Sequence, residues 1–324
     1  MRHTRRFITL GLATAAALCT LGAAAQDKFP SKPLRLVVPF APGGGNDAVA
    51  RMVGESLAAI LGQPVIVENR PGAGGNIGTD FVAKAPADGY TILHGSNGLV
   101  VNPYLYKKLP FDVQKDLAPI GLIATSPLLI LSNPKAPVTS LADLVQQLKD
   151  KKTKLSYASP GAGTPHHFAM ELLASHTNAD IVHVPYKGAS PALTDVVGGQ
   201  VPLLVSTPQS VADFVATGRL RMLATMEPVR MPEFKDVPAV AEAVPGFSVS
   251  IWHGLFVPAN TPQPAVSILT AALAKALADP QLQKRLAGVG FTGRFGSAAD
   301  LKGRMATELV TWKSVAEKAK IVPE

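Results

Sequence analysis

The chain has 324 residues, of which 47% are hydrophobic and 17% charged, and it carries a formal net charge of +8 at pH 7. A chain of this length exceeds one comfortable hydrophobic core, so we expect two lobes. Its single cysteine, Cys19, excludes a disulfide framework and a thiolate metal site. The basic residues are spread along the chain, and no aromatic residues interleave the one dense run at 149–154, so we expect no nucleic-acid partner.

The first 25 residues have the pattern of a secretory signal peptide, with a basic start, a short apolar stretch and small residues before the cleavage point. The apolar stretch is shorter than the roughly 20 residues of a membrane span. Arg5 and Arg6 partly match a twin-arginine signal; we favour the general secretory route, and the other route stays open. Cleavage near Ala25 would remove Cys19 and three arginines, which predicts a thiol-free periplasmic chain with a formal charge of +5.

Short β-branched runs alternate with helical patterns along the rest of the chain. The predicted strands lie at 34–40, 64–70, 90–96, 118–132, 154–159, 181–186, 201–206, 219–225 and 248–257. Between them lie helical segments such as 47–61, whose apolar residues share one face. This alternation predicts an α/β fold with largely parallel sheets and helices on both faces.

Two predicted strands, 118–132 and 248–257, are long and contain Pro or Gly residues in their middle that would interrupt a strand. Each of them could cross from one lobe to the other. The first lobe would then be discontinuous, formed by residues 26–129 plus 248–324, and residues 130–247 would form an inserted second lobe.

Several turns between a strand and a helix are rich in glycine and proline. The richest are PFAPGGGND at 39–47 and SPGAGTPHH at 159–167. Such turns lie at the carboxyl ends of strands, where open α/β sheets bind ligands. Free N–H groups at the helix starts favour an anion, and plain helix capping is the alternative for any single turn. Thr164 and Ser190 are the predicted N-cap residues of two of these helices.

The first of these turns also matches a dinucleotide-binding fingerprint. Gly43-x-Gly45-x-x-Ala48 follows a predicted strand and opens a predicted helix, and Glu68 ends the next strand. An exported NAD(P)-dependent oxidoreductase is therefore an alternative function. Pro42 and the export signal count against it, since nicotinamide cofactors are scarce outside the cytoplasm.

Other catalytic and metal-binding motifs are missing from the sequence. It contains no HExxH, GxSxG or CxxC motif and no GK[ST] after a glycine run, so we expect no catalytic residue, no cofactor and no metal. His166 and His167 are adjacent in a predicted first helical turn, which favours loop support over metal ligation. His94, His183 and His253 would form a metal cluster only if the fold brought them together.

Four segments in order resemble the Bug family of extracytoplasmic solute receptors, the TctC-type binding proteins of tripartite tricarboxylate transporters. They are PSKPLRLVVPFAPGGGNDAVAR, VIVENRPGAGGNIGTDFVAKAPADGYTIL, SYASPGAGTPHHFAMELL and IVHVPYKGASPALTDVVGGQV. The resemblance covers essentially the whole mature chain, and the ordered set is far more specific than any one segment. Ala41 stands where the family often has a second proline, and Asn46 stands where Thr or Ser is common.

The resemblance implies a two-lobed periplasmic binding protein of the Venus-flytrap, type II-like kind, without catalysis. Such a receptor would capture a small carboxylate-bearing solute, an organic acid or an amino acid, and close over it. It would act as a monomer in the periplasm and hand its ligand to a membrane permease of the tripartite tricarboxylate type. A ligand sensor that reports to a membrane kinase is a further alternative.

The resemblance also implies where the ligand binds. Backbone amides and ordered water would hold the ligand carboxylate, in place of an arginine clamp. For Asp47, attraction of a ligand amine and stabilisation of the helix dipole both stay open. The expected ligand-binding residues are Phe40, Ala41, Gly43, Gly44, Gly45, Asp47, Ser96, Asn97, Ser159, Gly161, Ala162, Gly163, Thr164, His167, Tyr186 and Gly188.

Overall fold

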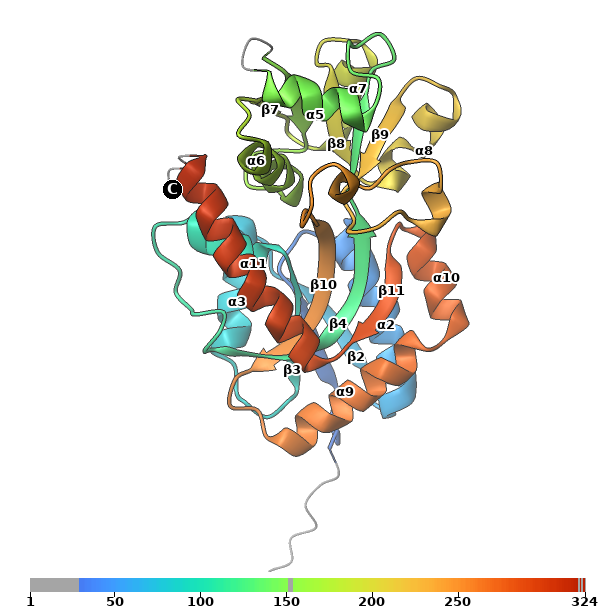
Figure 1. The fold of residues 1–324 in the computed structure, drawn as a ribbon. Coiled ribbons are helices and arrows are strands. Elements are labelled where there is room, and N and C mark those ends of the chain that lie inside the picture. Colours follow the sequence, from blue (N-terminus) through green and yellow to red (C-terminus); the bar gives the residue numbers. More distant parts are fainter. Residues whose placement is uncertain (1–28, 151–153, 320, 322, 324) are drawn as a thin grey trace, which may run out of the picture.

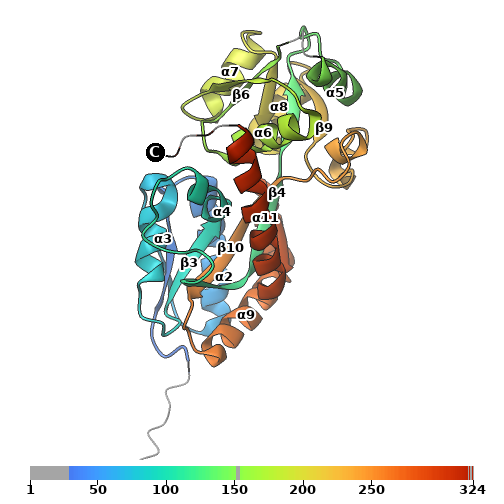
Figure 2. The same cartoon turned by 60° about the vertical axis from the view of Figure 1, so that its left-hand side comes forward.

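The computed structural model describes residues 29–150, 154–319, 321 and 323, so the predicted signal peptide lies outside the described residues. These residues form two lobes, one above the other in Figures 1 and 2. Each lobe is built on one mixed sheet that helices flank on both faces. Within the described ranges, none of the helices combines the length and the apolar composition that a bilayer crossing requires.

The first sheet has six strands in the order β11-β4-β10-β3-β1-β2. Strands β1, β2 and β3 are parallel, and β10 runs antiparallel to both β3 and β4. The strands are β1 (Leu34–Val38), β2 (Val65–Asn69), β3 (Thr91–Ser96), β4 (Leu117–Pro127), β10 (Ser250–Pro258) and β11 (Thr292–Gly296).

Within the described part of the chain, six helices flank this sheet. One buried cluster joins the sheet to α2, α9 and α10, and it contains Val49, Leu273 and Leu286. On the other face α3, α4 and α11 contribute Val82, Val100 and Met305 to a second cluster. The helices are α2 (Gly45–Leu61), α3 (Asn76–Ala83), α4 (Gly98–Val101), α9 (Gln263–Leu277), α10 (Pro280–Gly288) and α11 (Ala298–Lys318).

The second sheet has five strands in the order β7-β6-β8-β5-β9. Its strands are β5 (Leu129–Ser132), β6 (Ser156–Ser159), β7 (Val182–Pro185), β8 (Leu203–Ser206) and β9 (Arg221–Thr225). Strands β6, β7 and β8 are parallel, and β5 is antiparallel to its two neighbours. Its helices are α5 (Leu141–Lys149), α6 (Pro165–Thr177), α7 (Ala189–Val197) and α8 (Pro208–Ala216).

The chain passes between the two sheets twice. The predicted strand at 118–132 divides at Leu128, so that β4 pairs in the first sheet and β5 in the second. The predicted strand at 248–257 becomes β10 and stays in the first sheet, so it does not itself cross; the segment after β9 makes the return passage. There the Met226 N–H donates to the Leu128 carbonyl, and the Val249 N–H donates to the Met226 carbonyl, each at 2.8 Å.

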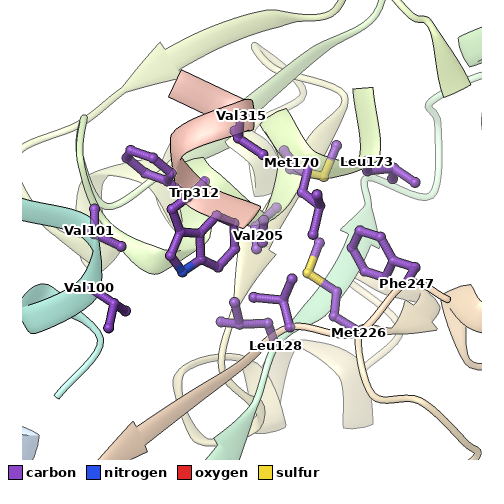
Figure 3. Close-up of a cluster of buried hydrophobic side chains, with 14 of the residues drawn as sticks. Val100, Val101, Leu128, Met170, Leu173, Val205, Met226, Phe247, Trp312 and Val315 are labelled. Carbon is purple, nitrogen blue, oxygen red and sulfur yellow. The ribbon is translucent and has the colours of Figure 1, made fainter. Parts of the chain in front are cut away.

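Helix α11 of the first lobe reaches the second lobe (Figure 2). Its Trp312 packs edge-on against Phe168 of α6, with 5.6 Å between the ring centroids. Figure 3 shows this region, where Val101 of α4 and the crossover residues Leu128 and Met226 share one apolar cluster with Trp312. One hydrophobic core therefore continues from the first lobe into the second.

Two local features differ from the sequence-based expectations. Strand β11 was not among the predicted strands, because Gly293 and Gly296 give its short segment little strand character. Thr164 caps α6 as predicted, but Ser190 lies inside α7 and is not its N-cap. Gly188 takes the N-cap position with a φ of +116°, a conformation that glycine adopts without strain, and this lets the helix begin earlier.

Candidate functional site

The first-lobe loop (residues 40–47) is held in shape by one buried carboxylate. Asp47 Oδ2 accepts hydrogen bonds from the Gly43 N–H and from Arg51 Nε, both at 2.9 Å, and Oδ1 accepts one from Asn69 Nδ2 at 2.9 Å. The hydrogen bond from Arg51 contributes most to lowering the pKa of this carboxyl to about 2. Asn69 also donates to the Phe40 carbonyl at 3.1 Å, so the loop is fixed at both of its ends.

The second-lobe loop (residues 159–164) rests on two stacked histidines. The Gly163 N–H donates to His167 Nδ1 at 3.1 Å, and His183 Nε2 lies 2.7 Å from Ser159 Oγ. The two imidazole rings stack with 4.0 Å between their centroids. Burial lowers the pKa of each histidine to about 4, so both are neutral at pH 7 and His167 Nδ1 can accept. This matches the loop-supporting role expected for His167.

Between these two loops lies a cavity of about 390 Å³. Its walls come from both lobes: the first-lobe loop, the segment after β3, strand β10, and the start of α6. The lining residues are Phe40, Asn46, Gly74, Ser96, Asn97, Gly98, Val101, Asn102, Leu105, Tyr106, Pro160, Ala162, Gly163, Thr164, Pro165, His166, Ile251 and His253.

The structure brings some of the expected site residues to this cavity and sets others behind it. Those that line it are Phe40, Ser96, Asn97, Ala162, Gly163 and Thr164. Those outside the lining are Ala41, Gly43, Gly44, Gly45, Asp47, Ser159, Gly161, His167, Tyr186 and Gly188. Most of the second group shape the two loops, whereas the Tyr186 hydroxyl donates to Asp195 Oδ2 at 2.6 Å.

Two long helices begin at opposite walls of the cavity. Asn46 lies in the first turn of α2 and His166 in the first turn of α6, and both residues line the cavity. N–H groups in a first turn have no acceptor within their own helix. In α6, Pro165 has no N–H and Thr164 Oγ1 accepts from the His167 N–H, so the free donor of residues 165–167 is that of His166. Together with the positive end of each helix dipole, these N–H groups make this space suitable for an anion.

Three polar side chains on the cavity wall each keep an unpaired buried atom. Asn46 Oδ1, His166 Nδ1 and His253 Nε2 have no hydrogen-bond partner among the described residues. Each of these atoms has almost no accessible surface, so none of them is reached from the cavity in this arrangement. Among the described residues that line it there is no Lys, Arg, Asp or Glu.

Sequence reasoning did not assign several of the lining residues to the site. From the sequence, Asn46 stands out only as a departure from the family pattern, and His166 only as loop support. The segment 97–106 follows the carboxyl end of β3, so the rule for open α/β sheets could have extended the site beyond Asn97. His253 lies on the antiparallel strand β10, to which that rule does not apply, and no sequence signal places it here.

The geometry counts against the dinucleotide interpretation. Glu68, which would have to bind a ribose, forms ion pairs with Arg35 at 3.0 Å and with Arg70 at 2.6 Å. The three histidines considered as metal ligands do not lie together in one cluster. His94 and His253 contact each other, while His183 lies in the second lobe beside Ser159.

Comparison with known proteins is consistent with this geometry. The sequence model described as the tripartite tricarboxylate transporter family receptor, TctC, matches residues 49–321. BugT of Bordetella pertussis is 35% identical over 321 residues, which cover 97% of this chain and 97% of BugT.

Two solved structures of Rhodopseudomonas palustris proteins are also similar. One contains adipate; it is 33% identical, has a TM-score of 0.75, and the match covers 91% of this chain and 100% of that one. The other is MatC with bound malate, at 32% identity, a TM-score of 0.72, and coverage of 89% and 99%. The chain therefore belongs to the TctC family of tripartite tricarboxylate transporter receptors.

Proposed function

We propose that this protein captures a small carboxylate-bearing solute in the periplasm and presents it to a membrane permease of the tripartite tricarboxylate type. The observation that carries the proposal is the cavity between the two loops, with a helix start from each lobe on its wall. The relatives with bound malate and adipate support the ligand class.

Capture works by closure of the two lobes. We divide them as residues 26–129 plus 248–324 and residues 130–247, a division that the membership of the two sheets supports. A ligand that contacts both loops stabilises the closed arrangement by its differential affinity for that state. The closed receptor is then the form that a permease would recognise. No step of this cycle needs bond chemistry, so we propose a receptor that is not an enzyme.

A thermal-shift screen tests the proposed function. The chain from residue 26 onward is unfolded and refolded to remove any carried ligand, and is then screened against malate, adipate, aromatic carboxylates, amino acids, NAD and NADP. A free ligand at about a hundred times its dissociation constant adds about 2.7 kcal/mol of stability. We expect a response to one class of small acids without turnover of the acid.

A response to NAD or NADP alone would replace the receptor by the oxidoreductase alternative. Arg35→Ala is a control variant for the oxidoreductase alternative, because it removes the ion pair between Arg35 and Glu68 and leaves the cavity wall intact. Co-purification with a membrane protein distinguishes a permease partner from a sensor kinase, which is the remaining alternative.

A further inference from the structure

One corner of the cavity carries two polar side chains to which the proposed function gives no role. Tyr106 and Asn102 both line the cavity, in the segment that follows α4, and both lie against Gly74 in the turn before α3. A Cβ placed on Gly74 would be 2.8 Å from Tyr106 Oη and 3.4 Å from Asn102 Nδ2. Gly74 lines the cavity as well, so the two side chains flank one patch of its wall.

The hydrogen bonds of Asn102 fix which way its amide faces. Asn102 Nδ2 donates to the Gly74 carbonyl at 3.0 Å and to Asn76 Oδ1 at 2.7 Å. A backbone carbonyl can only accept, so the nitrogen and not the oxygen of the Asn102 amide must face Gly74. Both amide hydrogens are then in use, and Asn102 Oδ1 remains as an atom that can only accept. A Cβ placed on Gly98, another lining residue, would be 3.9 Å from this oxygen.

Both side-chain oxygens are accessible. Within the described part of the chain, Tyr106 Oη and Asn102 Oδ1 take part in no hydrogen bond, and neither belongs to the buried polar atoms that lack a partner. Unlike the three buried atoms of the cavity wall described above, they therefore have exposed surface. Asn102 is only 7% exposed and lines the cavity, so the surface of its oxygen faces the cavity.

The two oxygens ask for different partners. The Tyr106 hydroxyl can donate or accept, whereas Asn102 Oδ1 can only accept. A ligand group that contains both a donor and an acceptor, such as a hydroxyl or a primary carboxamide, satisfies both. A carboxylate contains acceptors alone, so it would leave Asn102 Oδ1 unpaired, and the described lining offers neither Lys nor Arg to balance its charge.

We propose that Tyr106 Oη and Asn102 Oδ1 form a subsite that selects an uncharged hydrogen-bond donor on the ligand chain beyond its carboxylate. The preferred cargo is then a hydroxy acid or the half-amide of a dicarboxylic acid. In this respect it differs from the adipate that one relative contains. The inference rests on the proposed function, since it assumes that the ligand carboxylate binds at the helix starts.

Isothermal titration calorimetry with matched acids tests the subsite. Terminal hydroxy acids, from 3-hydroxypropanoate to 6-hydroxyhexanoate, are compared with the plain acid of the same chain length. Succinamate is compared with succinate, and glutaramate with glutarate. At the chain length that reaches the subsite, the wild-type chain is expected to bind the hydroxy acid about tenfold more tightly than the plain acid, the size of one net hydrogen bond. The half-amide is expected to bind about tenfold more tightly than the dicarboxylate.

Two Tyr→Phe variants form a matched pair. Tyr106→Phe removes an oxygen that has no partner among the described residues, and the affinity ratio of hydroxy acid to plain acid is expected to fall at least threefold. Tyr104→Phe removes a hydroxyl two positions away that donates to the Leu309 carbonyl at 2.6 Å and belongs to a residue outside the lining. In that variant the ratio is expected to stay as in the wild type.

Every outcome decides for or against the subsite. Equal binding of hydroxy and plain acids by the wild-type chain at every length, or a dicarboxylate that binds as tightly as its half-amide, overturns this inference and leaves the proposed function standing. If Tyr106→Phe weakens both kinds of acid equally, the hydroxyl binds the shared carboxylate, and the inference is again overturned. If no acid of the series binds the wild-type chain, the inference fails, and the broader thermal-shift screen decides separately about the proposed function.

Discussion

Asp47 illustrates how one side chain can hold a binding loop without touching a ligand. Its two oxygens accept from the Gly43 N–H, Arg51 and Asn69, and the carboxylate is only 4% exposed. These contacts leave it no free oxygen directed at the cavity, whose lining does not include it. They favour a bracing role over the attraction of a ligand amine.

Replacing Asp47 by Asn is expected to lower the free energy of unfolding by about 1.5 to 3 kcal/mol, the range for hydrogen bonds to a charged group. Urea titration measures this change. Asp213→Asn is the matched control, since Asp213 is an exposed residue of α8. Equal stability of the two variants would show that Asp47 does not brace the loop.

The contribution of Asp47 should also depend on pH. Its pKa falls from 3.8 to about 2 on folding, so the folded state favours the ionised form. The stability difference between wild type and Asp47→Asn is therefore fully present above about pH 4 and shrinks as the pH falls towards 2. Urea titrations from pH 2 to 6 check this, and a difference that grows on acidification would have the wrong sign.

At the scale of the loops, Gly163 sets how closely the two walls approach. Its φ is +76°, and an added Cβ would lie 2.7 Å from a methyl carbon of the Leu105 side chain, which belongs to the first lobe. Gly163→Ala is expected to weaken ligand binding about tenfold, because its backbone becomes strained and the Leu105 side chain at the cavity wall must shift. Calorimetry with the acid found in the screen measures this.

Gly288→Ala is the control for that substitution. Gly288 is exposed at the end of α10, has no neighbour within 4 Å of an added Cβ and is not a lining residue, so the affinity of this variant should stay close to wild type. Equal affinities of Gly163→Ala and Gly288→Ala would show that close approach at Gly163 is not needed.

Helix α11 of the first lobe contributes Trp312 to a hydrophobic core that it shares with the second lobe. Trp312→Ala removes a 3%-exposed ring that packs on Phe168, and such a truncation costs about 3 to 5 kcal/mol. Val310→Ala, at a position 73% exposed on the same helix, should change stability by less than about 0.5 kcal/mol. Urea unfolding compares them, and a small loss for Trp312→Ala would indicate that the interlobe cluster contributes little.

The elements that the sequence predicted are those with a strong local pattern. The pattern at 47–61 identifies α2, since Val49, Val53 and Leu57 recur at helical spacing and are all buried. Strand β11 lacks such a pattern and owes its position to pairing with β4. The contact of His253 with His94 joins residues 159 positions apart, so only the assembled sheet brings them together.

For the whole molecule, closure is the motion that the proposed function requires. Backbone passes from one sheet to the other near Leu128 and Met226, and α11 packs on the second lobe beside that passage. We expect the radius of gyration to decrease when the identified acid binds, as measured by small-angle X-ray scattering. An acid of the screen that gives no thermal shift is the control. A radius that stays constant at saturation would show that binding occurs without closure.

Affinity for a carboxylate and selectivity among carboxylates depend on different parts of this protein. The two opposed helix starts supply the proposed affinity through main-chain N–H groups, and the side chains of the cavity wall supply the selectivity. Every residue except proline has a main-chain N–H, so substitutions at the cavity wall by any residue other than proline leave the proposed anion contacts intact. Asn46, His166 and His253 are polar residues of that wall, and three codons encode them. A duplicated gene could therefore acquire a new cargo by changing a few wall residues, while the scaffold and its hold on a carboxylate stay the same.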